Sequence, residues 1–469
     1  MKKNKQKNPH RPPQNKYTVR IPVGPSAIPC ASVTLRVDSI ARISLISFSS
    51  PALKQGSISQ RAPPILLYYP MTIHTQWMTL MRQEASDAFT REPQSATEAS
   101  FIDGQIKLMK SESVQTWSHF LYSQFTSVVM RHFREFGCRT VVLAFDDKRH
   151  VPRAKAITQL KRRSGVSIIE FHETDTLPDA VPAWKEAIMN AHFKHKVIRL
   201  VVDNVPRLVN PPAGCTLITD WEEVVRYEYG EEGEPTISAV ELPGAKVGEA
   251  DIKFAQWMQH LARPMLLEAT DGDYIPISMG LKTIGVSHPI TILKGWRDDA
   301  PEFIDIDRLH SILTSAFRVA GRGRMQEGCE VQLFITLLGL AGTDFTRNLP
   351  LVSPSTMWAA LPVVVQTFAM EQDQLHIDAS QGKRLVELLY AEKFPKHVDP
   401  FSRKSIHQQI QASKLGERTK NLVPTDGRVA CTLRNINFLM AYWTRFAPPE
   451  DIREYGFRLG DAGAVEWDD

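Results

Sequence analysis

Short apolar runs rich in Val and Ile alternate with longer amphipathic stretches through the middle of the sequence. Runs of the first kind are typical of buried strands, whereas apolar residues spaced three and four apart predict helices. The predicted strands are 100–103, 140–145, 196–203, 265–267 and 291–296. The predicted helices are 71–81, 114–136 and 331–340, and residues 302–313 pass from strand to helix. This alternation predicts an α/β fold with a mainly parallel, doubly wound sheet.

Beyond Leu349 the helical spacing continues, with breaks at Pro residues. The helices predicted there are 356–370, 382–392 and 430–446. We therefore predict three parts, which are an N-terminal extension over 1–70, an α/β domain over 71–350 and a helical C-terminal region over 351–469. Within the α/β domain, residues 216–243 are acidic and irregular, and we expect a loop or hairpin insertion.

The composition is typical of a soluble globular protein, with 43% hydrophobic and 23% charged residues in a chain of 469. No apolar run reaches the roughly 18 residues that a membrane-spanning helix needs, so no membrane partner is expected. The five cysteines are far apart and form no CxxC pair. This spacing argues against a disulfide framework or a structural zinc site and favours a reducing compartment. We expect a monomer.

The N-terminal extension is strongly basic, although the net charge of the whole chain is only +4. Its 70 residues hold eleven Lys and Arg against one acid, Asp38. Such a polar segment cannot bury enough apolar surface to fold alone. It is open to three readings: a nuclear-localisation or phosphate-binding arm, a solvated tail without a dedicated role, or an organellar targeting segment. We expect a nuclear location, without excluding an organelle.

Acidic residues gather at the ends of the predicted strands and helices. The pairs Glu249/Asp251 and Asp271/Asp273 flank the apolar run 265–267. The other acids at such ends are Asp103, Asp146 and Asp344. Carboxylates that follow the carboxyl ends of parallel strands lie where α/β sheets form their ligand crevices. Several carboxylates close together repel one another unless a cation binds between them. An all-oxygen set suits Mg²⁺, with Mn²⁺ as a substitute, and two ions would use this many ligands.

A basic segment, 148–163, follows Asp146 directly and contains no acid. Its cations with helical spacing are Lys155, Lys161, Arg162 and Arg163. A phosphate backbone is a natural partner for such a helix. The other reading is a solvated helix face, which is what most charge runs are. The position next to a candidate metal ligand favours a nucleic-acid contact.

Six stretches between Met71 and Leu349 carry a family resemblance. They are MTIHTQWMTLMR, FIDG, VVLAFDDKRHVPRAKAITQLKRR, GEADIKFAQW, ATDGDYIPI and LLGLAGTDF. These stretches resemble, in order, motifs of the flap endonuclease/XPG nucleases of the PIN-like superfamily. The resemblance implies metal-binding roles for Asp103, Asp146, Glu249, Asp251, Asp271, Asp273 and Asp344. Asp251 replaces the family's usual second Glu, and Lys155 and Arg162 match its basic pair with the same seven-residue step.

The resemblance implies a PIN-like nuclease domain that hydrolyses phosphodiester bonds in DNA by a two-metal mechanism. It points to flap or 5′-end cleavage, in DNA repair or replication. The residues that would carry catalysis are Lys155, Arg162, Asp146, Glu249 and Asp271. The sequence departs from the family at Thr72, where Gly is usual, and at TRNLPLVSPSTMWAAL, which replaces the Gly-rich helix-turn-helix. No QxxLxxFF-like sliding-clamp motif is found near the C-terminus.

Two other functions remain open at this point. The same metal centre cuts RNA in relatives, so a PIN-like ribonuclease is one alternative. A catalytically inactive relative that only binds nucleic acid is the other, although such a descendant is expected to lose acids that this chain keeps.

Overall fold

The computed structural model describes residues 73–155, 167–231, 234–243, 246–297, 300–321, 329–367, 377–413, 415, 422–446, 449, 451–459 and 465–468. The N-terminal extension predicted over 1–70 lies outside these residues. Within them, nine strands form one sheet in the order β1-β9-β8-β7-β2-β3-β4-β5-β6. A separate pair is formed by β10 (Phe457–Leu459) and β11 (Val465–Trp467).

The centre of the large sheet is parallel, and its edges are antiparallel. The parallel strands are β8 (Ile290–Arg297), β7 (Met265–Glu268), β2 (Ala99–Asp103), β3 (Thr140–Ala144) and β4 (Thr216–Asp220). The antiparallel edge strands are β1 (Phe89–Thr90), β9 (Ala300–Asp305), β5 (Val224–Glu228) and β6 (Thr236–Ala239). The sheet therefore confirms the predicted α/β class with mainly parallel central strands.

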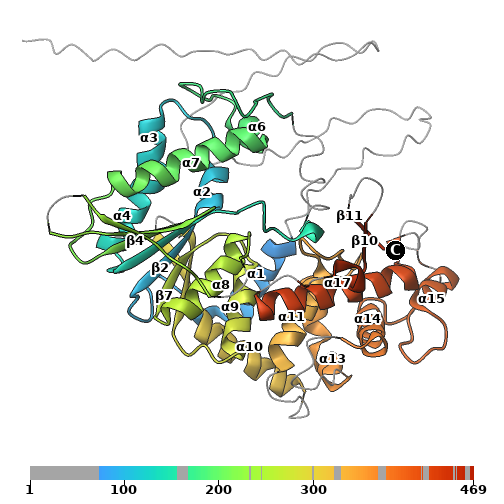
Figure 1. The fold of residues 1–469 in the computed structure, drawn as a ribbon. Coiled ribbons are helices and arrows are strands. Elements are labelled where there is room, and N and C mark those ends of the chain that lie inside the picture. The colour runs from blue at the N-terminus through green and yellow to red at the C-terminus, as the bar shows by residue number, and fades with distance from the viewer. Residues whose placement is uncertain are drawn as a thin grey trace, which may run out of the picture. The chain divides into compact units, whose positions relative to one another are not determined.

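Helices cover both faces of this sheet (Figure 1). Neighbouring strand residues alternate between two hydrophobic clusters, with Phe101 and Leu267 in one and Ile102 and Leu266 in the other. The helices of the second cluster are α3 (Trp117–Leu121), α4 (Ser127–Arg134), α6 (Trp184–Met189) and α7 (Ala191–Leu208). The helices of the first are α1 (Ile73–Glu84), α8 (Ala250–Leu261), α9 (Tyr274–Thr283), α10 (Ile306–Ala320) and α11 (Cys329–Ala341). A short helix, α2 (Gly104–Lys110), follows β2 directly.

The helical C-terminal region joins the first of these clusters. Its helices are α12 (Pro354–Ala359), α13 (Leu361–Thr367), α14 (Ala379–Lys393), α15 (Ile406–Ala412) and α17 (Asp426–Arg445). One hydrophobic cluster includes Leu340 before position 350 and Leu439 after it. The domain boundary placed at 350 stays a prediction. Among the described residues, no helix is both long and apolar enough to cross a membrane.

Most predicted elements are present, but the strand predicted over 196–203 is wrong. These residues lie inside α7, and Asp203 is an exposed helix residue rather than a strand end. Buried Phe193, Val197, Val201 and Val205 recur every four residues along this helix. A Val-rich segment favours strand by composition, and here the helical period of its buried face decides instead.

The loop or hairpin predicted over 216–243 is partly wrong. Residues Thr216–Asp220 form β4, a fully buried strand that pairs in parallel with β3. The remainder contains the expected hairpin, because β5 and β6 pair antiparallel at the edge of the sheet. The helix predicted over 114–136 is present, with one π-helical turn at Tyr122–Thr126, and Gly137 follows its end with φ 68°.

Candidate metal and nucleic-acid site

A cavity of about 910 Å³ opens at the carboxyl ends of the central parallel strands. The predicted acids that line it are Asp103, Asp146, Asp251, Asp271 and Asp344. Asp103 ends β2, Asp146 follows β3 by two residues, and Asp271 follows β7 by three. Because parallel strands end at the same edge of the sheet, the residues that follow these strands meet in one crevice. The structure thus brings residues together that are up to 241 positions apart in sequence.

Hydrogen bonds fix the acids at the ends of β2 and β3. The Oδ1 atom of Asp103 accepts from the backbone N–H groups of Gln105 at 2.9 Å and Ile106 at 3.3 Å, which caps α2. The hydroxyl of Tyr274 donates to the other oxygen of Asp103 at 2.8 Å. The Oδ1 atom of Asp146 accepts from the backbone N–H of Ala250 at 3.1 Å. Both carboxylates are therefore held in one orientation by neighbouring elements.

A close backbone approach at Gly248 brings the start of α8 to the end of β3. The N–H of Asp147 donates to the Gly248 carbonyl at 2.7 Å. A Cβ atom at residue 248 would lie 2.3 Å from the Asp147 carbonyl oxygen, so no larger residue fits without moving backbone. Glycine at this position lets α8 begin beside the end of β3, which places Asp251 of its first turn in the lining of the crevice.

Glu249 is buried below the crevice and is 1% exposed. Its carboxylate accepts hydrogen bonds from the Lys155 amine and from the Tyr442 hydroxyl of α17. Burial raises the pKa of Glu249, although Lys155 and Tyr442 act in the opposite direction. Burial alone would lower the pKa of Lys155, but the carboxylates of Glu249, Asp251 and Asp146 raise it well above its usual value. Lys155 is thus a permanent cation at neutral pH.

Burial and mutual repulsion raise the pKa values of three further carboxyl groups, Asp103, Asp251 and Asp273. Burial, followed by repulsion from Glu249, raises the pKa of Asp251 well above its usual value. Burial and repulsion from Asp271 and Asp344 do the same for Asp273. Burial and the charge of Asp146 raise the pKa of Asp103 to about 7. These mutual effects place all seven predicted acids in one electrostatic neighbourhood.

Oxygen-only side chains of this kind suit hard cations such as Mg²⁺ and Mn²⁺. In the described ranges, however, no three His, Cys, Asp or Glu side chains are already arranged to hold a metal ion. The metal-binding roles of the seven acids therefore stay predictions. Five of them line the crevice, and Glu249 and Asp273 interact electrostatically with several of those five.

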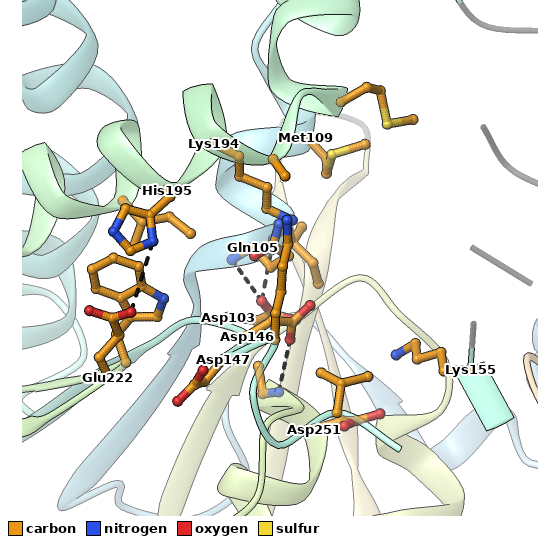
Figure 2. Close-up of a pocket in the computed structure, with 18 of the residues that line it drawn as sticks. Asp103, Gln105, Met109, Asp146, Asp147, Lys155, Lys194, His195, Glu222 and Asp251 are labelled. Atoms are coloured by element: carbon orange, nitrogen blue, oxygen red, sulfur yellow. Dashed lines mark hydrogen bonds and ion pairs between the residues drawn. The ribbon is translucent and has the colours of Figure 1, made fainter. Parts of the chain in front are cut away.

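Of the four predicted basic residues, the structure describes one, Lys155. Lys155 ends a short 3₁₀ turn, Arg153–Lys155, and lines the crevice beside Asp251 (Figure 2). Lys161, Arg162 and Arg163 lie outside the residues that the structure describes. Their predicted contacts with nucleic acid are left as predictions.

The first half of α7 supplies a basic wall that the sequence interpretation missed. Facing the acids, this wall consists of His192, Lys194, His195, Lys196 and Arg199. Lys194 extends from α7 toward Asp103 and Asp146, and His195 lies farther along the same helix (Figure 2). Because residues 196–203 were predicted as a strand, these basic residues were not recognised as lying on one helix. The helical spacing of the valines, had it been extended back to Phe193, would have placed these cations on one helix.

Two of the wall residues pack around a tryptophan at the end of β4. The Arg199 guanidinium lies 5.0 Å from the ring centroid of Trp221, and the His195 ring lies 4.7 Å from it. Arg199 also pairs with Glu222 at 2.6 Å. Part of the wall is therefore held in place by contacts within the chain.

A second buried charge cluster surrounds Glu268, the last residue of β7. Its carboxylate is bound by the Lys107 amine, by Arg131 at 2.8 Å and by His132 at 2.7 Å. Burial alone would raise the pKa of Glu268, but these partners lower it well below the usual range. Sequence reasoning did not single out this acid, because its partners come from distant segments.

The molecule is thus an α/β protein with an acid-lined crevice facing a basic helix. No protein-family model matches the sequence, and no curated protein matches it. Among solved structures, the catalytic core of Rad2 in complex with DNA substrate is similar at 13% identity and a TM-score of 0.38, over 79% of this chain and 87% of that one. A second Rad2–DNA complex shares 14% identity, with a TM-score of 0.34, over 77% and 99% of the two chains.

A third similar structure is the T5 D15 protein co-crystallised with metal ions. It shares 13% identity, with a TM-score of 0.29, over 72% of this chain and 99% of that one.

Proposed function

We propose that this protein is a divalent-metal-dependent endonuclease that hydrolyses phosphodiester bonds in DNA, with a preference for a flap or 5′ end. One observation carries the proposal: strand-end carboxylates and the basic wall of α7 face each other across one cavity. A phosphodiester needs both partners, since cations bind its backbone and acids hold the metal ions that activate water.

The seven acids named above are the residues that would hold two Mg²⁺ ions, for which Mn²⁺ could substitute. Bound there, the ions would lower the pKa of a water molecule and neutralise charge on the leaving oxygen. The chain's own contribution is to hold the acids in place. Tyr274 and two backbone N–H groups orient Asp103, and the start of α8 orients Asp146.

Lys155 would stabilise negative charge on the scissile phosphate, together with Arg162. The raised pKa keeps Lys155 cationic, and its pairing with Glu249 holds the amine at the edge of the crevice. A fixed positive charge in a partly buried site stabilises a developing charge more strongly than one in bulk water.

The choice of DNA over RNA rests on the family resemblance, because a basic wall binds the phosphates of either. Matched flap substrates made of DNA and of RNA separate the two. Faster cleavage of the RNA substrate would replace the DNA reading with the ribonuclease alternative.

The test is cleavage of an end-labelled flap DNA with Mg²⁺ by the full-length protein and by Asp271→Asn. Asp271 is exposed in the crevice, so the substitution is not expected to disturb folding. We expect a loss of about 10²- to 10³-fold, the range for removing one electrostatic contributor to a transition state. Asp426→Asn, an exposed acid in the first turn of α17, is the matched control and should cleave as wild type. Equal cleavage by Asp271→Asn would remove the proposed site.

A further inference from the structure

A second, smaller cavity of about 110 Å³ adjoins the crevice. The two cavities share the lining residues Ile106, Lys110 and Thr270. Thr270 directly precedes Asp271, so the two cavities share a lining residue next to this acid. The small cavity is therefore next to the proposed reaction centre and outside it.

Cations dominate the lining of the small cavity. They are Lys107, Lys110, Arg131 and Lys294, and the lining contains one carboxylate, Glu268. Glu268 is already bound by Lys107 and Arg131, so this single carboxylate is shared among several cations. The Lys294 amine donates to the Thr270 carbonyl, and burial lowers its pKa to about 8, so it is mainly protonated at pH 7. The cavity is suited to an anion.

An exposed tryptophan, Trp296, forms part of the same lining. It is 56% exposed, so part of the indole is accessible to a ligand. The pairing of β8 with β9 shifts register between Leu293 and Gly295, and Gly295 has φ 151°. Such a bulge re-aims the side chains that follow it. The Arg131 guanidinium lies over the Trp296 ring at 5.6 Å, which holds the ring at the cavity.

We propose that Trp296, Lys110 and Lys294 form a subsite for one unpaired nucleotide beside the crevice. The base stacks on the exposed ring of Trp296, and the backbone phosphate lies against the two amines. An aromatic platform next to cations is the combination that single-stranded nucleic acid uses, and a base has a face to stack whatever its sequence. The inference rests on the proposed function, since it supplies a reason for acting on substrates with unpaired ends.

The experiment measures binding, without cleavage, of the full-length protein to fluorescent DNA in EDTA. Three DNA molecules are compared: a flap substrate, the same substrate with abasic flap nucleotides, and a blunt duplex. We expect Trp296→Ala to weaken flap binding roughly tenfold, within the range for one base–aromatic stack. Binding to the abasic flap and to the duplex should change little. Trp296→Phe keeps an aromatic face and should retain most of the affinity.

The chain offers matched controls for both parts of the subsite. Phe401 is 82% exposed and carries the Arg384 guanidinium over its ring at 4.5 Å, but it lies in the C-terminal region. Phe401→Ala should therefore bind all three DNA molecules as wild type does. Lys110→Ala should weaken binding to the normal and abasic flaps alike and reduce the salt dependence, whereas exposed Lys396→Ala should not.

The outcomes separate the subsite from the proposed function. If Trp296→Ala binds the flap as tightly as wild type, or loses equal affinity for the abasic flap, the subsite is wrong even where the wild type cleaves DNA. If the tenfold effect is found but no divalent ion supports cleavage, the subsite stands and the nuclease proposal fails. A wild-type protein that binds none of the three DNA molecules would overturn both.

Discussion

Two charge clusters, one around Glu268 and one in the crevice around Asp271, lie within a few residues of each other at the end of β7. The pKa values of their acids are shifted in opposite directions. Glu268 is surrounded by Lys107, Arg131 and His132, and these partners lower its pKa. The acids around Asp271 and Asp273, three and five positions later, repel one another, and the pKa of Asp273 is raised. The Glu268 carboxylate is neutralised by neighbouring cations, whereas the acids of the crevice raise one another's pKa values.

This difference distinguishes Glu268, whose charge stabilises the fold, from the crevice acids, whose charge is available for a function. The Glu268 carboxylate accepts hydrogen bonds from Lys107 of α2 and Arg131 of α4 and contacts His132, and these contacts fix both helices to the sheet. A crevice of carboxylates that raise one another's pKa values destabilises the folded state unless a cation binds. Perturbed carboxylates in a cleft are candidates for function for this reason.

Removal of the acid from the neutralised cluster should have the largest effect on stability. Glu268→Gln leaves Lys107 and Arg131 buried without their counter-charge, and we expect a loss of about 3 to 5 kcal/mol in the free energy of unfolding. Urea denaturation measures it. Glu466→Gln, which breaks an exposed pair with Arg458, is the control and should stay within about 1 kcal/mol of wild type. A small loss for Glu268→Gln would mean that the two clusters are alike.

Removal of an acid from the crevice should have the opposite sign. In EDTA, Asp251→Asn relieves repulsion with Glu249, and we expect an increase of about 1 kcal/mol in the free energy of unfolding, typical of a single favourable change. The same substitution should abolish part of the stabilisation by Mg²⁺. Denaturation with EDTA and with Mg²⁺ measures both, and destabilisation in EDTA would show that Asp251 is already neutralised.

The pH dependence should distinguish the clusters by a smaller effect. A carboxyl group with a raised folded-state pKa keeps its proton in the folded state, so stability in EDTA falls as pH rises from about 4 to about 7. Asp103, Asp251 and Asp273 all act in this direction. Glu268, with a lowered pKa, contributes fully above about pH 5 and loses its contribution only in acid.

Thermal melting with EDTA at pH 5.5 and 7.5 checks this expectation. We expect the lower melting temperature at pH 7.5, and Mg²⁺ should raise it more at pH 7.5 than at pH 5.5. A higher melting temperature at pH 7.5 in EDTA would contradict the raised pKa values of the carboxyl groups in the crevice.

The sequence predicted most central strands of the sheet and the acids that follow them because both depend on local signals, while the metal-binding roles of these acids stay predictions. A short apolar run followed by Asp marks a strand end at Asp103 and Asp146, and the parallel order brings such ends together. The spacing of acids around the run 265–267 identified the rest of the set. These signals act over a few residues, and the structure confirms the elements that they predict.

The remainder depends on packing between distant segments. Residues 196–203 contain enough Val and Ile for a strand, and only their burial at every fourth residue makes them part of α7. Tyr442 reaches Glu249 from a helix 193 positions away, and no local pattern announces that contact. Glu268 could not be recognised as neutralised, because Lys107 and Arg131 come from other elements.

The most direct measurement of the central claim is anomalous diffraction from crystals of the full-length protein soaked with Mn²⁺. We expect Mn²⁺ peaks in the crevice, within coordination distance of oxygens from Asp146, Asp251 and Asp271, and no peak at Glu268. A crevice without a peak, or a peak bound by Glu268 instead, would contradict the account.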